Sequence, residues 1–367
     1  MSADLVSAKD AKFAFIVHLI EPWTWLLRWF RHLNSNPYLA IFWTWTWPLC
    51  FLMTYLYKVG NKAYDIVDRF VFSGMPGETV VVRNFAHHFS GENRTIIPRI
   101  LEAVLAAQDR GATVIGLGAL IKGETVTQGG ALILDKLGDK LKVPVVHGDT
   151  MTAAVVLQQC LQIVRAMKLE KPVFIIGATS KIGRALALAL VKRGVRVRML
   201  SGAHQRFVAI QNEAGPNGHL LEYASQVREG ADCPFWVTGK AQPSGEEIIK
   251  HLPKDGTVIN FSVPDPLTSA LLVKRRDVRH FDGGLMAYDP KTTSMWFRMR
   301  LVPGLTYACH AGTITHSFMG WKHHEVGPVE VELLDAVLEA GKRAGFSLPP
   351  WTSFLRLALL FPAQEAA

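Results

Sequence analysis

An alternation of short apolar runs with longer amphipathic stretches begins near residue 79 and constrains the fold more than any other sequence feature. The β-branched apolar runs predict buried strands, and the stretches with apolar residues at helical spacing predict the helices between them. Strands that alternate with helices indicate parallel sheets built from right-handed crossovers. We therefore expect an α/β fold made of two Rossmann-like parallel-sheet units.

The expected elements form two series. The first series has strands at 79–83, 112–117 and 143–147, with helices at 97–110 and 150–168. The second series has strands at 172–176, 195–200, 233–237, 257–261 and 278–281, with helices at 181–193, 204–214 and 246–252. Two further helices are expected at 306–321 and 329–346.

The N-terminal quarter has a different pattern, which indicates a membrane. Six of the ten tryptophans precede residue 48, and residues 38–57 contain no charged side chain. That stretch matches the roughly 20 residues needed to cross a bilayer core. Residues 13–33 mix tryptophans with arginines, which is typical of an interfacial amphipathic helix. We expect a membrane-associated helical anchor over 1–77 and a core that folds without residues 1–60; a re-entrant segment and a soluble core helix stay open.

The charge and cysteine content narrow the class of partner and the compartment. Lys and Arg number 40 against 31 for Asp and Glu, which suits a lipid surface or a phosphorylated cofactor. The positive charge is spread along the chain without a basic run, so no nucleic-acid partner is expected. The four cysteines form no CxxC pair, which favours a reducing compartment. We expect a membrane-associated protein that faces the cytoplasm, at the endoplasmic reticulum or another intracellular membrane.

Residues 173–183 contain the clearest local motif. An apolar strand runs into a turn that opens a helix; Gly177 allows the turn and Gly183 allows close packing of helix on strand. The N-terminus of such a helix binds a pyrophosphate through its free N–H groups. Ser180 stands where the middle glycine of this motif usually lies, so a plain tight turn in a domain that has lost its cofactor also stays open.

The end of the next predicted strand indicates the type of cofactor. Folds that prefer NAD place an acidic residue there, roughly 20 residues after the motif, to bind the ribose hydroxyls. This sequence has Ser201, His204 and Arg206 in that region and no acid, which favours the 2′-phosphate of NADPH, although Arg206 could also be a solvated cation. The expected cofactor-binding residues are Gly177, Ala178, Thr179, Ser180, Lys181, Ile182, Gly183, Ser201, His204, Arg206 and Thr238.

Cys309 is the cysteine with the features of a nucleophile. It follows a Pro-Gly pair where a helix is expected to begin, and a helix N-terminus and the neighbouring His310 both lower the pKa of a thiol. Small residues at Ala308, Ala311 and Gly312 leave room for a substrate. A thiolate here could attack a thioester before hydride delivery, although a buried structural cysteine is an equal alternative.

Two histidine-containing segments are candidates for a ligand-binding site or a metal site. The residues His147-Gly148-Asp149-Thr150 follow a predicted strand, where α/β sheets bind ligands, but Asp149 or Thr150 could equally cap a helix. His316, His323 and His324 with Glu325 match no established two-histidine box, so we expect no metal site.

These residues resemble two related families. Residues from about 79 to 347 resemble the cyanobacterial long-chain acyl-(acyl-carrier-protein) reductase, chiefly at Gly118, Gly148-Asp-Thr150-Met-Thr152, Gly177 to Gly183, Asp282-Gly-Gly284, Ala308-Cys309 and Gly320-Trp321. Residues from about 16 onward resemble the C-terminal portion of the plant eceriferum wax-alkane proteins. That signature is Val17-His18-Leu, Cys309-His-Ala-Gly312 and Gly320-Trp-Lys-His-His-Glu-Val-Gly327.

The resemblance implies a membrane-anchored, NADPH-dependent reductase that converts a long-chain acyl-CoA or acyl-ACP thioester into a fatty aldehyde through an acyl group on Cys309. It implies substrate contacts at Gly118, Gly148, Asp149, Thr150 and Thr152, and a partner enzyme that consumes the aldehyde. The implied domains are 78–169 on the substrate side, 170–305 for NADP, and 306–367 as helices that complete the active site.

Two departures from these families affect the implied function. Ser180 replaces the reductase glycine, which puts the affinity for the cofactor in doubt. The histidine boxes of the wax-alkane di-iron domain are not in this sequence, so the resemblance implies that this chain does not itself make alkanes. The alternative function is a non-catalytic lipid-binding or scaffold subunit of a membrane complex.

Overall fold

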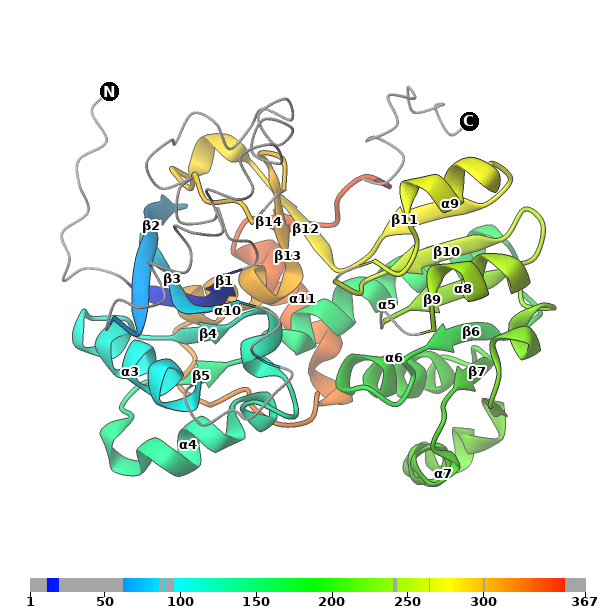
Figure 1. Cartoon of the computed structure of the whole chain (residues 1–367), viewed down its shortest axis with the longest axis horizontal. Coiled ribbons are helices and arrows are strands. Elements are labelled where there is room, and N and C mark those ends of the chain that lie inside the picture. Colours follow the sequence, from blue (N-terminus) through cyan, green and yellow to red (C-terminus); the bar gives the residue numbers. More distant parts are fainter. Residues whose placement is uncertain are drawn as a thin grey trace. The chain divides into compact units, whose positions relative to one another are not determined.

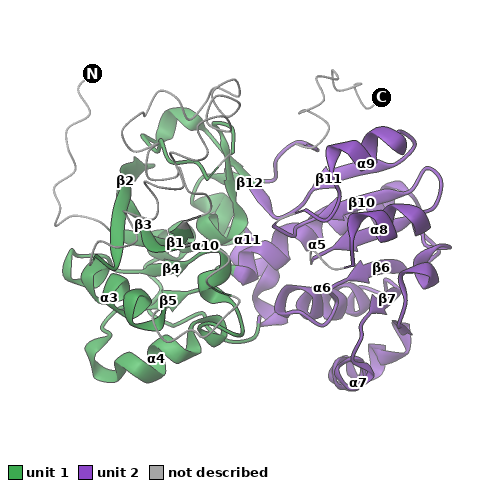
Figure 2. Ribbon diagram, viewed as in Figure 1, with its two compact units in different colours: residues 1–148, 286–328, 339–347 green, residues 149–285, 329–338, 348–367 purple. Residues whose placement is uncertain are grey.

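The computed structural model describes residues 12–19, 62–85, 89, 96–239, 243–263, 265–299 and 301–353. The chain divides into two compact units (Figures 1 and 2). Unit 1 comprises 1–148, 286–328 and 339–347, and unit 2 comprises 149–285, 329–338 and 348–367. The observed boundary at 148/149 differs from the expected one at 169/170, and residues 306–328 belong to unit 1 rather than to a separate C-terminal domain.

Unit 1 is built on a five-stranded sheet in the order β2-β3-β1-β4-β5. Strand β1 pairs in parallel with β3 and β4, β4 pairs in parallel with β5, and β2 forms an antiparallel edge with β3. The strand bounds are Phe13–Leu19 (β1), Tyr64–Phe72 (β2), Met75–Phe85 (β3), Ile115–Leu117 (β4) and Val145–Val146 (β5).

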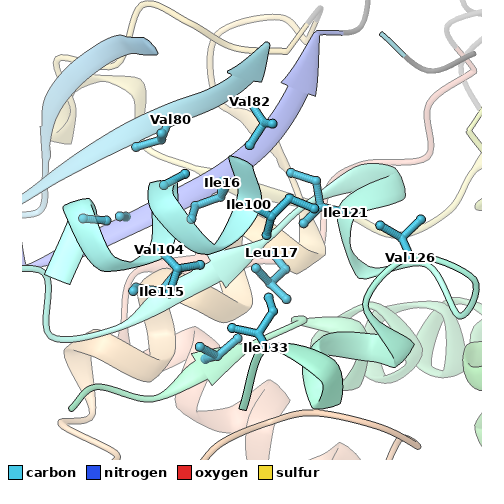
Figure 3. Close-up of a cluster of buried hydrophobic side chains, with 14 of the residues drawn as sticks. Ile16, Val80, Val82, Ile100, Val104, Ile115, Leu117, Ile121, Val126 and Ile133 are labelled. Carbon is cyan, nitrogen blue, oxygen red and sulfur yellow. The ribbon is translucent and has the colours of Figure 1, made fainter. Parts of the chain in front are cut away.

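Helices and a smaller sheet complete unit 1. The helices are α3 (Ile96–Asp109), α4 (Ala131–Leu137) and α10 (Ala308–Phe318). A three-stranded sheet in the order β13-β12-β14 contains Leu305–Tyr307, Leu285–Tyr288 and Phe346–Ser347. Figure 3 shows the apolar core, in which Ile16 of β1, Val80 of β3 and Ile115 of β4 meet Ile100 and Val104 of α3.

Strand β1 corrects the predicted interfacial helix over residues 13–19. Phe13, Ala14, Phe15, Ile16 and Val17 are all buried, so both faces of the strand are covered. A continuous apolar run of this kind is what a central parallel strand requires. The aromatic and cationic pattern that suggested a helix comes from residues 23–32, which lie outside the described residues.

The predicted anchor over 1–77 is therefore wrong for residues 13–19 and 64–72, which are strands of unit 1. The apolar stretch 38–57 also lies outside the described residues. Within the part of the chain that the structure describes, no helix has the length and hydropathy to cross a membrane.

Unit 2 is a doubly wound parallel sheet in the order β11-β10-β9-β6-β7-β8. All five strand pairs are parallel. Counted from β6 as the first strand, the order is 3-2-1-4-5-6, which is the dinucleotide-binding arrangement. The strands are Val173–Ile176 (β6), Val197–Leu200 (β7), Leu221–Ala224 (β8), Phe235–Thr238 (β9), Thr257–Asn260 (β10) and Arg279–Asp282 (β11).

The helices of unit 2 lie close to the predicted positions, except for the short helix at Ser269–Lys274, which was not predicted. They are α5 (Asp149–Ala166), α6 (Lys181–Lys192), α7 (His204–Glu213), α8 (Gly245–His251) and α9 (Ser269–Lys274). Helix α11 spans Leu334–Arg343, inside the predicted 329–346. The expectation of an α/β fold with parallel sheets is confirmed, and unit 2 has the Rossmann strand order.

Candidate functional site

The loop between β6 and α6 has the geometry that the sequence predicts. Gly177 has a φ of +79°, which a residue with a side chain rarely adopts. A Cβ on Gly183 would lie 2.3 Å from the carbonyl oxygen of Gly177 and 2.8 Å from the Cα of Ala178. Helix α6 therefore approaches the loop closely only because residue 183 is glycine.

Ser180, which replaces the middle glycine, caps helix α6. Its backbone is extended, and its Oγ accepts a hydrogen bond from the N–H of Gly183 at 3.2 Å. The first N–H groups of a helix are the donors that a bound pyrophosphate would use. Ser180 thus occupies one of these donors, and a phosphate at that position requires the serine side chain to turn away.

A cavity of about 440 Å³ lies at the carboxyl ends of β6, β7 and β8. Its lining residues are Ile176, Gly177, Thr179, Leu200, Ser201, Gly202, Ser225, Gln226, Val227, Pro243 and Glu247. Doubly wound sheets bind dinucleotides at the carboxyl ends of their strands, so the cavity has the expected place. Sequence reasoning missed Ser225 and Gln226, which directly follow β8, and Glu247, which lies in the first turn of α8.

Arg206 lines a second hollow, of about 220 Å³, rather than the main cavity. Thr179 belongs to both linings, and Arg184 and Glu213 also face the second hollow. Arg184 is paired with Glu213, with its Nε 2.7 Å from Oε2. Among the described residues, no acidic side chain pairs with Arg206, so this cation is available for an anion.

The other expected cofactor residues have structural contacts. His204 is exposed and lies edge-on to Tyr223, with ring centroids 4.7 Å apart. Thr238 is buried and donates from Oγ1 to Oδ1 of Asn260 at 2.7 Å. Lys181 forms a 3.3 Å ion pair with Asp149, the first residue of α5. Ala178 lies in the turn between β6 and α6, and Ile182 lies in the first turn of α6.

Cys309 is the second residue of α10, so the helix begins where the sequence predicts. The side chain is half-buried and packs against an apolar cluster of unit 1. The buried members of that cluster are Phe15, Val17, Val67, Val81, Phe297 and Met299, with Trp296 and Tyr307 at its margin. The thiol therefore lies at the margin of a packed apolar core.

His310 does not have the expected role beside Cys309. Its ring is fully buried, 4.6 Å from the ring of Phe15, and Nδ1 is 3.0 Å from Oγ1 of Thr306. Burial lowers the pKa of His310 to about 3, so the imidazole is neutral at physiological pH. Adjacent residues of a helix point in different directions, and here position 310 faces the core. The prediction that a charged His310 activates Cys309 is wrong.

Gly148 brings two predicted segments of unit 1 together. Its φ is +65°, and a Cβ there would lie 2.3 Å from the carbonyl oxygen and 2.7 Å from the Cα of Cys309. The start of α10 thus packs directly on the backbone of residue 148. Gly118 has a packing role too, because a Cβ would come within 2.7 Å of Phe15 and Val17. Asp149, Thr150 and Thr152 form the first turn of α5 in unit 2.

The segment 320–327 extends the sheet of unit 1 at β5. The backbone of Glu325 bonds to Val145 and His147, and the Glu325 carboxylate lies 3.0 Å from Nδ1 of His147. His324 accepts from the N–H of Val145 at 3.1 Å through Nδ1. His316 bonds through Nε2 to the carbonyl of His323 at 3.0 Å. These hydrogen bonds give the side chains of His316 and His324 a structural role.

Comparison with known proteins finds a family match in the second half of the chain. Residues 173–348 match the family model for the CER1-like, C-terminal domain. This segment is similar to the CER1-like C-terminal domain, and it contains parts of both unit 1 and unit 2. The match includes the β6–α6 loop, Cys309 and the segment 320–327.

The relatives of the CER1-like domain come from plants. Very-long-chain aldehyde decarbonylase GL1-1 of Oryza sativa subsp. indica is 33% identical over 302 residues, which are 82% of this chain and 46% of that protein. GL1-2 of Oryza sativa subsp. japonica is 32% identical over 307 residues, with the same coverage. The chain spans about half the length of these curated relatives. Among solved structures, L-tryptophan dehydrogenase from Nostoc punctiforme is 10% identical and superposes with a TM-score of 0.38, over 92% of this chain and 80% of that one. This TM-score indicates only a weak structural similarity.

The relatives correct the predicted reaction. Their names describe enzymes that decarbonylate very-long-chain aldehydes, and none of these names refers to an acyl thioester. The prediction of an acyl thioester reductase is therefore wrong, and the acyl-cysteine intermediate on Cys309 is withdrawn with it. The resemblance to wax-alkane proteins is confirmed, and the resemblance to the cyanobacterial reductase stays a prediction.

Proposed function

We propose that the CER1-like chain binds NADP(H) in unit 2 and acts as an oxidoreductase at the aldehyde stage of very-long-chain lipid metabolism. The observation that carries this proposal is the cavity beside Gly177 in a 3-2-1-4-5-6 parallel sheet. Its position and its glycine-dependent loop fit a dinucleotide. Bound NADPH would supply a hydride, and the residues of the chain provide the binding and orientation.

The preference for NADPH rests on charge at the end of β7. At the end of β7 the cavity is lined by Ser201 and Gly202, neither of which is the acid that binds a free ribose hydroxyl in NAD-preferring folds. The acidic residue in the lining, Glu247, lies in α8. Arg206 faces the adjoining hollow beside Thr179. A guanidinium forms charge-assisted hydrogen bonds with a phosphate, so Arg206 favours a cofactor with a 2′-phosphate.

The proposed substrate is a long-chain aldehyde, the class named for the relatives. The apolar cluster beside Cys309 supports this choice, because it makes the immediate surroundings of the thiol apolar. The thiol of Cys309 can add reversibly to an aldehyde: a C–S bond forms, the carbonyl π bond opens, and the thiol proton passes to the oxygen. We propose this adduct as the way in which the aldehyde is held.

A non-catalytic lipid-binding or scaffold subunit is the second candidate. Ser180 favours it, because its Oγ occupies the N–H of Gly183 that a pyrophosphate would use. We also propose that the protein is located at an intracellular membrane and that a partner enzyme consumes the aldehyde.

Two binding experiments separate the candidates. NADPH and NADH are each titrated into the full chain, and Cys309 is alkylated with iodoacetamide with and without a long-chain aldehyde. The proposal expects NADPH binding and protection of Cys309 by the aldehyde. Cys160 is fully buried and should stay unalkylated in both samples of the folded chain. A chain that binds neither nicotinamide cofactor supports the scaffold instead.

A further inference from the structure

Three side chains from separate parts of unit 2 meet in a hydrogen-bonded row. Asp265 follows β10, His280 lies in β11, and Ser353 lies near the end of the described chain. Oδ2 of Asp265 is 2.9 Å from Nε2 of His280, and Nδ1 of the same ring is 2.8 Å from Oγ of Ser353. The imidazole is 2% exposed, so both of its nitrogens are committed to these two partners.

The carboxylate fixes the direction of these hydrogen bonds. Oδ1 of Asp265 accepts from the N–H of Leu267 at 2.8 Å, which orients the carboxylate toward the ring. An ionised carboxylate only accepts, so Nε2 of His280 carries the proton of the neutral ring. The lone pair of Nδ1 then faces the hydroxyl of Ser353. An oriented base in contact with a hydroxyl is the arrangement that activates a serine nucleophile.

The neighbouring residues position Ser353 and supply apolar surface. The N–H of Asp282 donates to the carbonyl of Thr352 at 2.8 Å, and the ring of Trp351 lies 4.8 Å from that of Phe281. These contacts hold the segment 351–353 along β11. Val263, two residues before Asp265, is 71% exposed, and Trp351 is 42% exposed. Large apolar side chains exposed beside a polar row suit a ligand with an acyl chain.

We propose that Asp265, His280 and Ser353 form a hydrolytic centre for carboxylic esters with an apolar acyl group. Oγ of Ser353 attacks the acyl carbon while Nδ1 of His280 takes its proton, and the ester C–O bond breaks as that proton passes to the leaving alcohol. Water then attacks the acyl carbon of the acyl-serine and gives a proton to Nδ1. The bond between the acyl carbon and Oγ breaks as Nδ1 returns that proton to Oγ, which releases the carboxylic acid and restores Ser353 and the neutral ring. Asp265 holds Nε2–H throughout, and no oxidation or reduction occurs. A carboxylate oxygen of Asp282 lies within 4.8 Å of a carboxylate oxygen of Asp265 and of a ring nitrogen of His280, so Asp282 further stabilises the transient imidazolium.

A fluorophosphonate probe tests this centre on the full chain. The protein is incubated with the probe in EDTA, the intact mass is recorded, and the labelled peptide is sequenced. The proposal expects one adduct, on Ser353, and hydrolysis of p-nitrophenyl octanoate that the probe abolishes. A folded chain that takes no label, or takes it on another serine, overturns the proposal.

Matched variants separate a catalytic role from a structural one. Ser353→Ala should lose the label, whereas Ser347→Ala, at an exposed serine of β14, should label like the wild type. Asp265→Asn keeps the size of the side chain but favours the wrong ring tautomer, and should slow labelling at least ~100-fold. Circular dichroism must show a folded protein. A folded Asp265→Asn that labels at the wild-type rate contradicts the proposal, as does labelling that requires a metal.

Discussion

Gly183 and Gly202 lie in the same unit but have very different surroundings. A Cβ on Gly183 would meet backbone atoms at 2.3 Å, whereas a Cβ on Gly202 would meet nothing within 4 Å. We therefore predict that Gly183→Ala lowers the free energy of unfolding by about 2–4 kcal/mol, because the backbone of the loop must move. Gly202→Ala should change it by less than about 0.5 kcal/mol. Urea unfolding of both variants checks the prediction, and equal stabilities would contradict the packing of α6.

The charge of Arg206 should distinguish the two nicotinamide cofactors. We predict that Arg206→Ala weakens NADPH binding by about 1–3 kcal/mol and leaves NADH binding almost unchanged, because only the 2′-phosphate is lost as a partner. Arg193→Ala is the control, since Arg193 pairs with Asp335 at 2.5 Å just past the C-terminus of α6. Calorimetric titration measures both cofactors. An equal loss for NADPH and NADH would make Arg206 a structural residue.

The buried His310 should make stability depend on pH. Its pKa is about 3 in the folded chain and lies near 6.5 in the unfolded chain, so the unfolded state takes up the proton first as the pH falls. Stability from this group is present above pH 6.5 and falls by up to about 1.4 kcal/mol per pH unit between pH 6.5 and 3. His316, whose pKa burial lowers to about 4, adds to the same slope.

The comparison of wild type with His310→Phe isolates that contribution. The variant keeps a ring beside Phe15 but has no titrating group, so its unfolding free energy should fall less steeply between pH 6.5 and 4. Denaturant unfolding at several pH values gives both slopes. Parallel slopes would mean that His310 is not neutral in the folded chain.

At the scale of elements, β1 is the strand on which unit 1 depends. It lies between β3 and β4, and its apolar residues are buried on both faces. The position of β1 argues against the expectation that a core without residues 1–60 folds. We predict that deletion of residues 1–19 unfolds unit 1, whereas deletion of residues 1–11 leaves it folded. Hydrogen exchange of β3 and β4 measures the difference, and strong protection after the longer deletion would contradict the sheet order.

The alternation of strands and helices could be predicted from residue 79 onward because each buried run was short and β-branched. Strand β8 was missed, since Leu221–Ala224 has only four residues, two of them half-buried and one of these charged. Strand β1 was missed because its apolar run lies close to the tryptophans of 23–29, which dominated the interpretation of the segment. The loop glycines and the start of α10 were predictable from local rules of backbone conformation. The orientation of His310 was not, because it depends on the packing of α10 against β1.

At the scale of the whole molecule, the chain combines a doubly wound unit with a mixed-sheet unit. The strand order of unit 2 fixes where a dinucleotide would bind, and the packing of α10 on Gly148 fixes where Cys309 lies in unit 1. Sequence reasoning located both features but assigned the wrong reaction, because a nucleophilic cysteine and a hydride donor suit several carbonyl substrates. The names of the relatives, rather than the geometry, replaced the thioester with an aldehyde.

Titration of the full chain with NADPH and NADH tests the central claim most directly. The cavity beside Gly177 and the cation of Arg206 predict saturable NADPH binding, at least about tenfold tighter than NADH binding, as one charge-assisted contact contributes more than about 1.4 kcal/mol. Gly183→Ala should weaken binding of both cofactors. The absence of saturable binding for either cofactor in a folded chain would contradict the account, and Ser180 would then mark a nucleotide-binding fold that no longer binds its nucleotide.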